Sequence, residues 1–141
     1  MKLRKVISLV LVVLILSSLV SAYAVELDED LPPDDPEPYI GVTSIGASLS
    51  INSMGKATCY GYVNLSSGYT ATASLSLQQY NSGSWITIIS WSATGGPTIS
   101  IHGTHYVTAG YSYRAKITAV VYDQNGNYVE TVSATSSTVY Y

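Results

Sequence analysis

Apolar and polar residues alternate along positions 109–123, and this pattern restricts the fold more than any other feature of the chain. A period of two places successive side chains on opposite faces of a strand, whereas the same pattern would spread them around a helix. We therefore predict a strand with one buried face. The buried set is Tyr113, Ala115, Ile117, Ala119 and Val121, and the solvent-facing set is Arg114, Lys116, Thr118 and Tyr122.

Other segments between residue 39 and the C-terminus also have strand character, and none has a helical period. Turn-forming residues separate them at intervals of about ten residues, which is typical of a sandwich of two antiparallel sheets. A closed barrel is the alternative. We predict an all-β domain of about seven strands, which include 45–53, 56–65, 70–80, 84–92 and 98–107, with 39–42 as a short edge piece.

The sequence Asn125-Gly126 predicts the last hairpin, because this dipeptide tolerates the positive φ angles of a two-residue type I′ turn. Asp123 is expected to form local hydrogen bonds in this turn. The predicted register places Tyr122 opposite Val129, Ala119 opposite Val132 and Ile117 opposite Ala134.

Four positions favour an immunoglobulin/fibronectin-like sandwich over other β folds. Gly110 shortly before Tyr113 matches the corner at which such domains bond a tyrosine hydroxyl to upstream backbone. Cys59 on the second strand and Ala115, two residues after Tyr113, occupy the places of the disulfide of immunoglobulin domains. We predict that Cys59 is a buried thiol that fills the core; an intermolecular disulfide is the alternative.

The N-terminus has the features of a secretory signal peptide. Lys2, Arg4 and Lys5 precede an apolar run at 6–20, and Ala22-Tyr23-Ala24 fits a cleavage site. We predict a signal peptide at 1–24 and a secreted, extracellular mature chain without a stable membrane anchor. An uncleaved signal anchor is the alternative.

Residues 25–38 predict an acidic, proline-rich, disordered tether. Seven of the twelve residues at 26–37 are acidic, and prolines interrupt the segment at positions 32, 33, 36 and 38. A spacer is favoured over a calcium site or a propeptide, because the ligand spacing of a calcium loop is missing. The β domain at 39–141 holds Lys56, Arg114 and Lys116 against Asp123 and Glu130, so it has too little positive charge to bind nucleic acid.

The β domain offers few groups for catalysis or for metal binding. His102 and His105 lie three positions apart on a predicted strand, so they are expected on opposite faces, whereas metal ligands must converge. The β domain has one aspartate and one glutamate besides these histidines, which is too few groups to supply a nucleophile's base and an orienting acid. We therefore expect no enzyme activity, no catalytic residues, no metal and no cofactor.

Aromatic residues are the candidate binding groups. In a regular strand Trp85 and Trp91 share a face, and if that face is outward they form with Tyr80 a surface on which sugars or a protein could stack. If it is inward they belong to the core, which is favoured for at least one of them. Tyr60, Tyr62, Arg114 and Lys116 are also expected to face outward, where the two cations could attract the acidic tether or an anionic wall polymer.

Several runs resemble a family of short secreted proteins of Gram-positive bacteria (Firmicutes) that is catalogued only as a domain of unknown function. They are residues 39–59, Leu77-Gln-Gln-Tyr80, Ser84-Trp85 and Gly110-Tyr-Ser-Tyr-Arg114. The resemblance implies secretion and a compact β domain, and it transfers no catalytic residues. Residues 110–127 are loosely similar to the last hairpin of fibronectin type III domains, which bind partners.

We therefore expect a secreted, non-enzymatic β-sandwich that acts by surface contact with a cell-wall glycan or an extracellular protein. The first alternative is a carbohydrate-binding module that uses Trp85, Trp91 and Tyr80. The second is a small toxin-like or bacteriocin-like effector.

Overall fold

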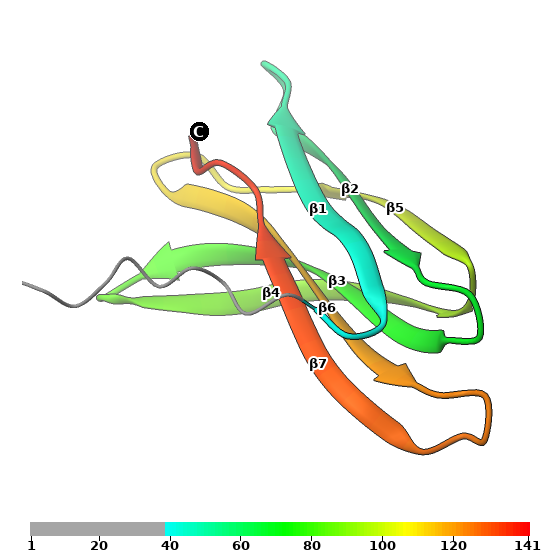
Figure 1. Ribbon diagram of the computed structural model, residues 1–141. Helices are drawn as coiled ribbons and strands as arrows, with labels where there is room; N and C mark the ends of the chain where they lie inside the picture. The colour runs from blue at the N-terminus through cyan, green and yellow to red at the C-terminus, as the bar shows by residue number, and fades with distance from the viewer. Residues whose placement is uncertain (1–38) are drawn as a thin grey trace, which may run out of the picture. The chain divides into compact units, whose positions relative to one another are not determined.

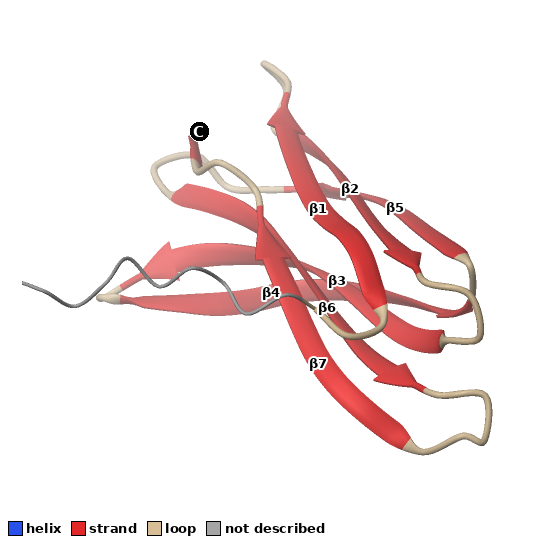
Figure 2. Cartoon of the chain, in the orientation of Figure 1, coloured by secondary structure: helices blue, strands red, loops and turns tan. Residues whose placement is uncertain are grey.

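The computed structural model describes residues 39–141, all of whose regular elements are strands (Figures 1 and 2). The expectations for a signal peptide at 1–24 and a tether at 25–38 fall outside the described residues. The strands are β1 (Val42–Ile51), β2 (Lys56–Leu65), β3 (Thr70–Asn81), β4 (Ser84–Gly95), β5 (Thr98–Tyr106), β6 (Ser112–Tyr122), β7 (Tyr128–Thr135) and β8 (Val139–Tyr140).

Two antiparallel sheets pack face to face. One has the strand order β1-β2-β5, and the other has the order β4-β3-β6-β7, with the short β8 pairing beside β6. In Figure 1 the first sheet lies at the upper right, and the second runs below it. The prediction of an all-β sandwich of about seven strands is confirmed.

The core lies between the sheets and is built from alternate residues of the central strands. Tyr113, Ala115, Ile117, Ala119 and Val121 of β6 are fully buried, as the period of two predicts. Beside them in the same sheet, β3 contributes Ala71, Ala73, Leu75 and Leu77, and β2 of the opposite sheet contributes Ala57, Cys59 and Val63. Strands at the sheet margins are less buried, because only part of each inner face is covered.

Some strand ends differ from the predictions. β1 begins at Val42 and ends at Ile51, so it absorbs part of the expected edge piece at 39–42. β4 continues to Gly95 instead of ending at Ser92, and β6 begins only at Ser112. Because the pairing of β4 with β3 extends to Ala71↔Gly95, ladder partners rather than local sequence decide where β4 ends.

The turn between β6 and β7 is not the predicted type I′ turn. Gly126 has φ 80°, but Asn125 is not among the residues with positive φ. The N–H of Gly126 donates to the carbonyl of Asp123 and the N–H of Asp123 to the carbonyl of Asn127, which makes a three-residue loop with glycine in the left-handed position. The register is right for Ala119↔Val132 and Ile117↔Ala134, but Tyr122 pairs with Tyr128 instead of Val129.

A two-residue turn with positive φ at both central positions occurs instead between β3 and β4. Ser82 has φ 52° and Gly83 has φ 85°, and the flanking residues Asn81 and Ser84 pair directly. These angles are those of a type I′ turn. This tight turn fixes the register of the hairpin that carries Tyr80 and Trp85.

The predicted tyrosine corner is present at the start of β6. The hydroxyl of Tyr113 donates to the carbonyl of Thr108, and it accepts a hydrogen bond from Nε2 of Gln79 at 3.0 Å. Tyr113 is the largest fully buried side chain of the described domain. Cys59 and Ala115 are both fully buried in the core, so Cys59 fills the core as predicted.

Within residues 39–141 the structure contains no helix that could cross a membrane.

Candidate functional site

An irregularity in β4 separates the two tryptophans. Ile89 pairs with Leu77 and Thr87 pairs with Gln78, so Ile88 is an extra residue with no partner on β3. Such a bulge reverses the alternation of side chains on either side of it. The prediction that Trp85 and Trp91 share a face is therefore wrong, because that prediction assumed a regular strand.

Trp91 faces the core. It pairs with the fully buried Leu75 and packs against the hydrophobic core. A Cβ atom built on Gly103 of β5 would lie 2.2 Å from two atoms of the Trp91 ring, so the indole lies directly on the glycine backbone. The expectation that at least one tryptophan belongs to the core is confirmed, and Trp91 is not available for stacking on a ligand.

Trp85 faces outward on the other side of the same sheet. It pairs with Tyr80, which is 45% exposed, and the two ring centroids are 5.2 Å apart with an interplanar angle of 56°. Both residues flank the tight turn at Ser82 and Gly83, so the hairpin holds the two rings side by side. They are the aromatic part of the candidate site.

Arg114 of β6 reaches over the same surface. Its Cζ atom lies 4.2 Å from the centroid of the Trp85 ring, and its Nε donates to Oε1 of Gln78 at 2.9 Å. Gln78 also donates from Nε2 to the hydroxyl of Thr87 at 3.3 Å. Stacking and hydrogen bonding together fix the plane of the guanidinium.

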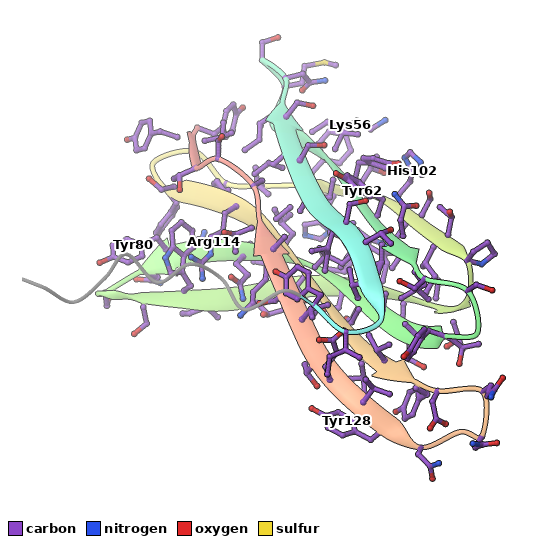
Figure 3. The ribbon with its side chains drawn as sticks, in the orientation of Figure 1. Lys56, Tyr62, Tyr80, His102, Arg114 and Tyr128 are labelled. Carbon is purple, nitrogen blue, oxygen red and sulfur yellow. The ribbon has the colours of Figure 1, made fainter. Side chains whose placement is uncertain are left out.

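We call this cluster the Trp85 patch; its members are Gln78, Tyr80, Trp85, Arg114 and Lys116. Lys116 lies two residues beyond Arg114 on β6 and therefore on the same face. Figure 3 shows Tyr80 and Arg114 together near the β3–β4 hairpin, with Tyr128 far away on β7. The patch thus combines aromatic rings, an amide and two cations.

The described acidic residues are both engaged in backbone contacts away from the patch. The Asp123 carboxylate accepts from the N–H groups of Asn125 and Asn127 at 2.8 and 2.9 Å. Oε1 of Glu130 accepts from the N–H of Gly41 at 2.8 Å. Since the sequence from Lys56 to Tyr122 contains no acidic residue, the Trp85 patch carries net positive charge.

A second aromatic cluster, the Tyr60 row, lies on the outer face of the other sheet. The ring centroid of Tyr60 is 4.6 Å from that of His102 and 6.1 Å from that of Tyr62. Tyr62 covers Gly46, whose added Cβ would approach the Tyr62 ring to 2.7 Å. The outward direction predicted for Tyr60 and Tyr62 is confirmed, and the Tyr62 ring shields backbone.

The two histidines do not converge. His102 pairs with Tyr60 on the outer face, whereas His105 pairs with the fully buried Ala57 on the inner face. Among residues 39–141, no group of three or more His, Cys, Asp or Glu side chains is placed to hold a metal ion. Burial raises the pKa of the Cys59 thiol to about 11, so the thiol stays protonated at neutral pH.

A shallow hollow lies between the β2–β3 loop and the β6–β7 turn, lined by residues that include Ser67, Tyr69 and Asp123. Hydrogen bonds from the backbone of Asn127, with smaller contributions from the Asn127 side chain and from the backbone of Asn125 and Gly126, lower the pKa of Asp123. The carboxylate is therefore committed to the turn. The hollow offers no constellation for chemistry.

The structure thus brings together Tyr80, Trp85, Arg114 and Lys116 from the predicted candidates, and it leaves Trp91, Tyr60 and Tyr62 elsewhere. Sequence reasoning did not single out Gln78, which orients Arg114, or His102 as a neighbour of Tyr60. The alternation of β3 places Gln78 on the face of Tyr80, which is a signal for the first of these contacts.

Comparison with known proteins finds no matching family model, no similar curated protein and no similar solved structure.

Proposed function

We propose that the domain is a secreted binding module that recognises a glycan of the cell surface through the Trp85 patch. The observation that carries the proposal is the outward pair of Tyr80 and Trp85, held 5.2 Å apart on a tight hairpin beside the hydrogen-bonded Arg114. Apolar C–H faces of sugar rings pack on aromatic rings, and polar groups at the ring edge bond to sugar hydroxyls. This cluster offers both kinds of contact.

Rigidity supports a binding role. The patch lies on paired strands of one sheet, and its side chains restrain one another, so little conformational freedom is lost when a ligand binds. The scarcity of titratable groups favours binding over catalysis: the described domain has one Asp, one Glu and two separated His residues. Of the predicted alternatives, the carbohydrate-binding module fits this arrangement best, with Trp91 removed from its site.

The immunoglobulin-like assignment is part of the proposal. Its support is the packing of β1-β2-β5 against β4-β3-β6-β7 and the hydroxyl bond of Tyr113 at the start of β6. In such a sandwich the outer sheet faces are free for contacts.

A glycan array probed with residues 25–141, the expected mature chain, tests the proposed function. We expect binding to a subset of cell-surface glycans, including peptidoglycan fragments, and loss of at least about tenfold in affinity for Trp85→Ala. Tyr128→Ala is the matched control, because Tyr128 is an exposed aromatic of the same sheet far from the patch. Equal retention by Trp85→Ala, Tyr128→Ala and the unaltered chain would contradict the proposal.

A further inference from the structure

We infer that the ligand of the Trp85 patch is an anionic polysaccharide, whose carboxylate or phosphate groups bind Arg114 and Lys116 while its sugar rings contact Tyr80 and Trp85. This inference rests on the proposed function and specifies the chemical class of the glycan. Three observations support it: the fixed orientation and free donors of the Arg114 guanidinium, the spacing of Arg114 and Lys116 along β6, and the distribution of charge over the domain.

The guanidinium of Arg114 is prepared to bind an oxyanion. Gln78 uses only the Nε–H group, and the two Nη groups carry four further donors. The Trp85 ring lies against one face of the guanidinium, 4.2 Å from ring centroid to Cζ, which restricts rotation of the side chain. A guanidinium held in this way can donate two parallel hydrogen bonds to a carboxylate or a phosphate.

Lys116 provides a second anchor along the same strand. Arg114 and Lys116 are two residues apart on β6, so their Cα atoms are separated by about 7 Å. Two cations at this separation suit a polymer that carries an anionic group on successive units better than they suit a single small anion. A lysine ammonium is a compact donor that adapts to variable positions, so it complements the fixed guanidinium.

The charge of this face is uncompensated within the described domain. Asp123 is bound to the backbone of the β6–β7 turn, and Glu130 is bound to Gly41, while β3, β4 and β6 contain no acidic residue. The anionic groups of a ligand therefore meet no acidic side chain that would repel them at the patch. The opposite sheet has Lys56 as its cation, four residues from Tyr60 along β2, so the concentration of two cations beside two rings is specific to the Trp85 patch within the described domain.

A nucleic acid is the less suitable anionic polymer. Nucleic-acid binding depends on neutralising several phosphates, and the patch has only two cations. A polysaccharide obtains additional affinity from contacts of its rings with Tyr80 and Trp85. The combination of few charges with two outward rings therefore favours an acidic glycan.

Binding to matched polymers tests this inference. Residues 25–141 would be titrated by calorimetry with polygalacturonate, with its fully methyl-esterified form, and with a phosphorylated mannan, at low and high salt. The ester has the same sugar backbone without the charge, and the phosphate polymer separates the two kinds of anion. We expect at least one anionic polymer to bind about tenfold more tightly than the neutral ester, with binding weakened by salt.

Variants separate the contributions of charge and geometry. Arg114→Gln and Lys116→Gln should each reduce affinity for the bound anionic polymer about tenfold, and Lys56→Gln on the other sheet should leave it unchanged. Arg114→Lys should also lose affinity, because it retains the charge but not the planar fork. Circular dichroism of each variant checks that the fold is intact.

Three results would overturn the inference. Equal affinity for the polygalacturonate and its neutral ester, without binding of the phosphate polymer, would exclude an anionic requirement and would leave the proposed glycan-binding function standing. A loss of binding in Lys56→Gln equal to that in Arg114→Gln would place the site elsewhere. Failure of all three polymers to bind, together with a glycan array on which Trp85→Ala has no effect, would overturn the proposed function itself.

Discussion

Gly103 shows how a single residue determines the packing of a much larger one. The Trp91 indole rests on the backbone of Gly103, and a methyl group there would lie 2.2 Å from ring atoms. Since overpacking a dense core typically costs about 1–3 kcal/mol, we expect Gly103→Ala to lower the free energy of unfolding by about that amount, measured by urea denaturation. Ser100→Ala, on the exposed face of β5, is the control. If both variants are equally stable, Trp91 does not pack here as described.

Cys59 makes a separable contribution to stability at alkaline pH. Burial raises the pKa of the folded-state thiol from 9.0 to about 11, so unfolded chains lose this proton first as the pH rises. Below pH 9 the contribution is fully present, and between about pH 9 and 11 it is lost at up to about 1.4 kcal/mol per pH unit. We expect Cys59→Ala to show a shallower alkaline fall of unfolding free energy than the unaltered chain. Parallel curves would contradict the burial of an ionisable thiol.

At the scale of elements, the bulge at Ile88 accounts for Trp85 facing outward while Trp91 faces inward on the same strand. Because Thr87 and Ile89 pair with adjacent residues of β3, removing Ile88 alone would leave a regular strand with these pairs retained. We expect the Ile88 deletion to keep Trp85 outward and to change the unfolding free energy by only about 1 kcal/mol. Tryptophan quenching by iodide, with Trp85→Phe identifying the accessible ring, measures this. Loss of the accessible tryptophan signal would contradict the outward orientation that pairing with β3 gives Trp85.

The β6–β7 turn depends on the charge of Asp123. Its pKa is lowered chiefly by the backbone N–H of Asn127, so the carboxylate stabilises the folded state above the unfolded-state pKa. This stability is lost as the pH falls through the lowered pKa. We expect the melting temperature of the unaltered chain to fall more between pH 6 and pH 3 than that of Asp123→Asn. Identical pH profiles would contradict the role of the turn carboxylate.

Sequence pattern predicted the elements well where one face is buried. The period of two in β2, β3 and β6 follows from core packing, so it identified Cys59, Leu75 and Ile117 as inward residues. The pattern failed at Ile88, because a bulge is decided by pairing with the neighbouring strand and leaves no local signal. It failed also at Asn125-Gly126, since a glycine with positive φ serves both a two-residue turn and the three-residue loop that the structure contains.

At the scale of the molecule, the sandwich separates two aromatic surfaces onto opposite sheets. The Tyr60 row lies on the outer face of β2 and β5, and the Trp85 patch lies on the outer face of β3, β4 and β6 (Figure 3). Only the second combines its rings with Arg114 and Lys116. Sequence reasoning grouped Trp85 with Tyr80 and, separately, Arg114 with Lys116, and their assembly into one site required the register of β3, β4 and β6.

The two tryptophans of the chain allow a direct measurement of where the ligand binds. In a ¹H–¹⁵N correlation spectrum of residues 25–141, each indole N–H gives one resonance, and Trp85→Phe and Trp91→Phe assign them. On titration with the glycan identified on the array, we expect the Trp85 resonance to shift progressively while the Trp91 resonance remains in place, because Trp91 is packed on Gly103. A ligand that binds without moving the Trp85 resonance, or that moves only the Trp91 resonance, would contradict a binding surface at the Trp85 patch.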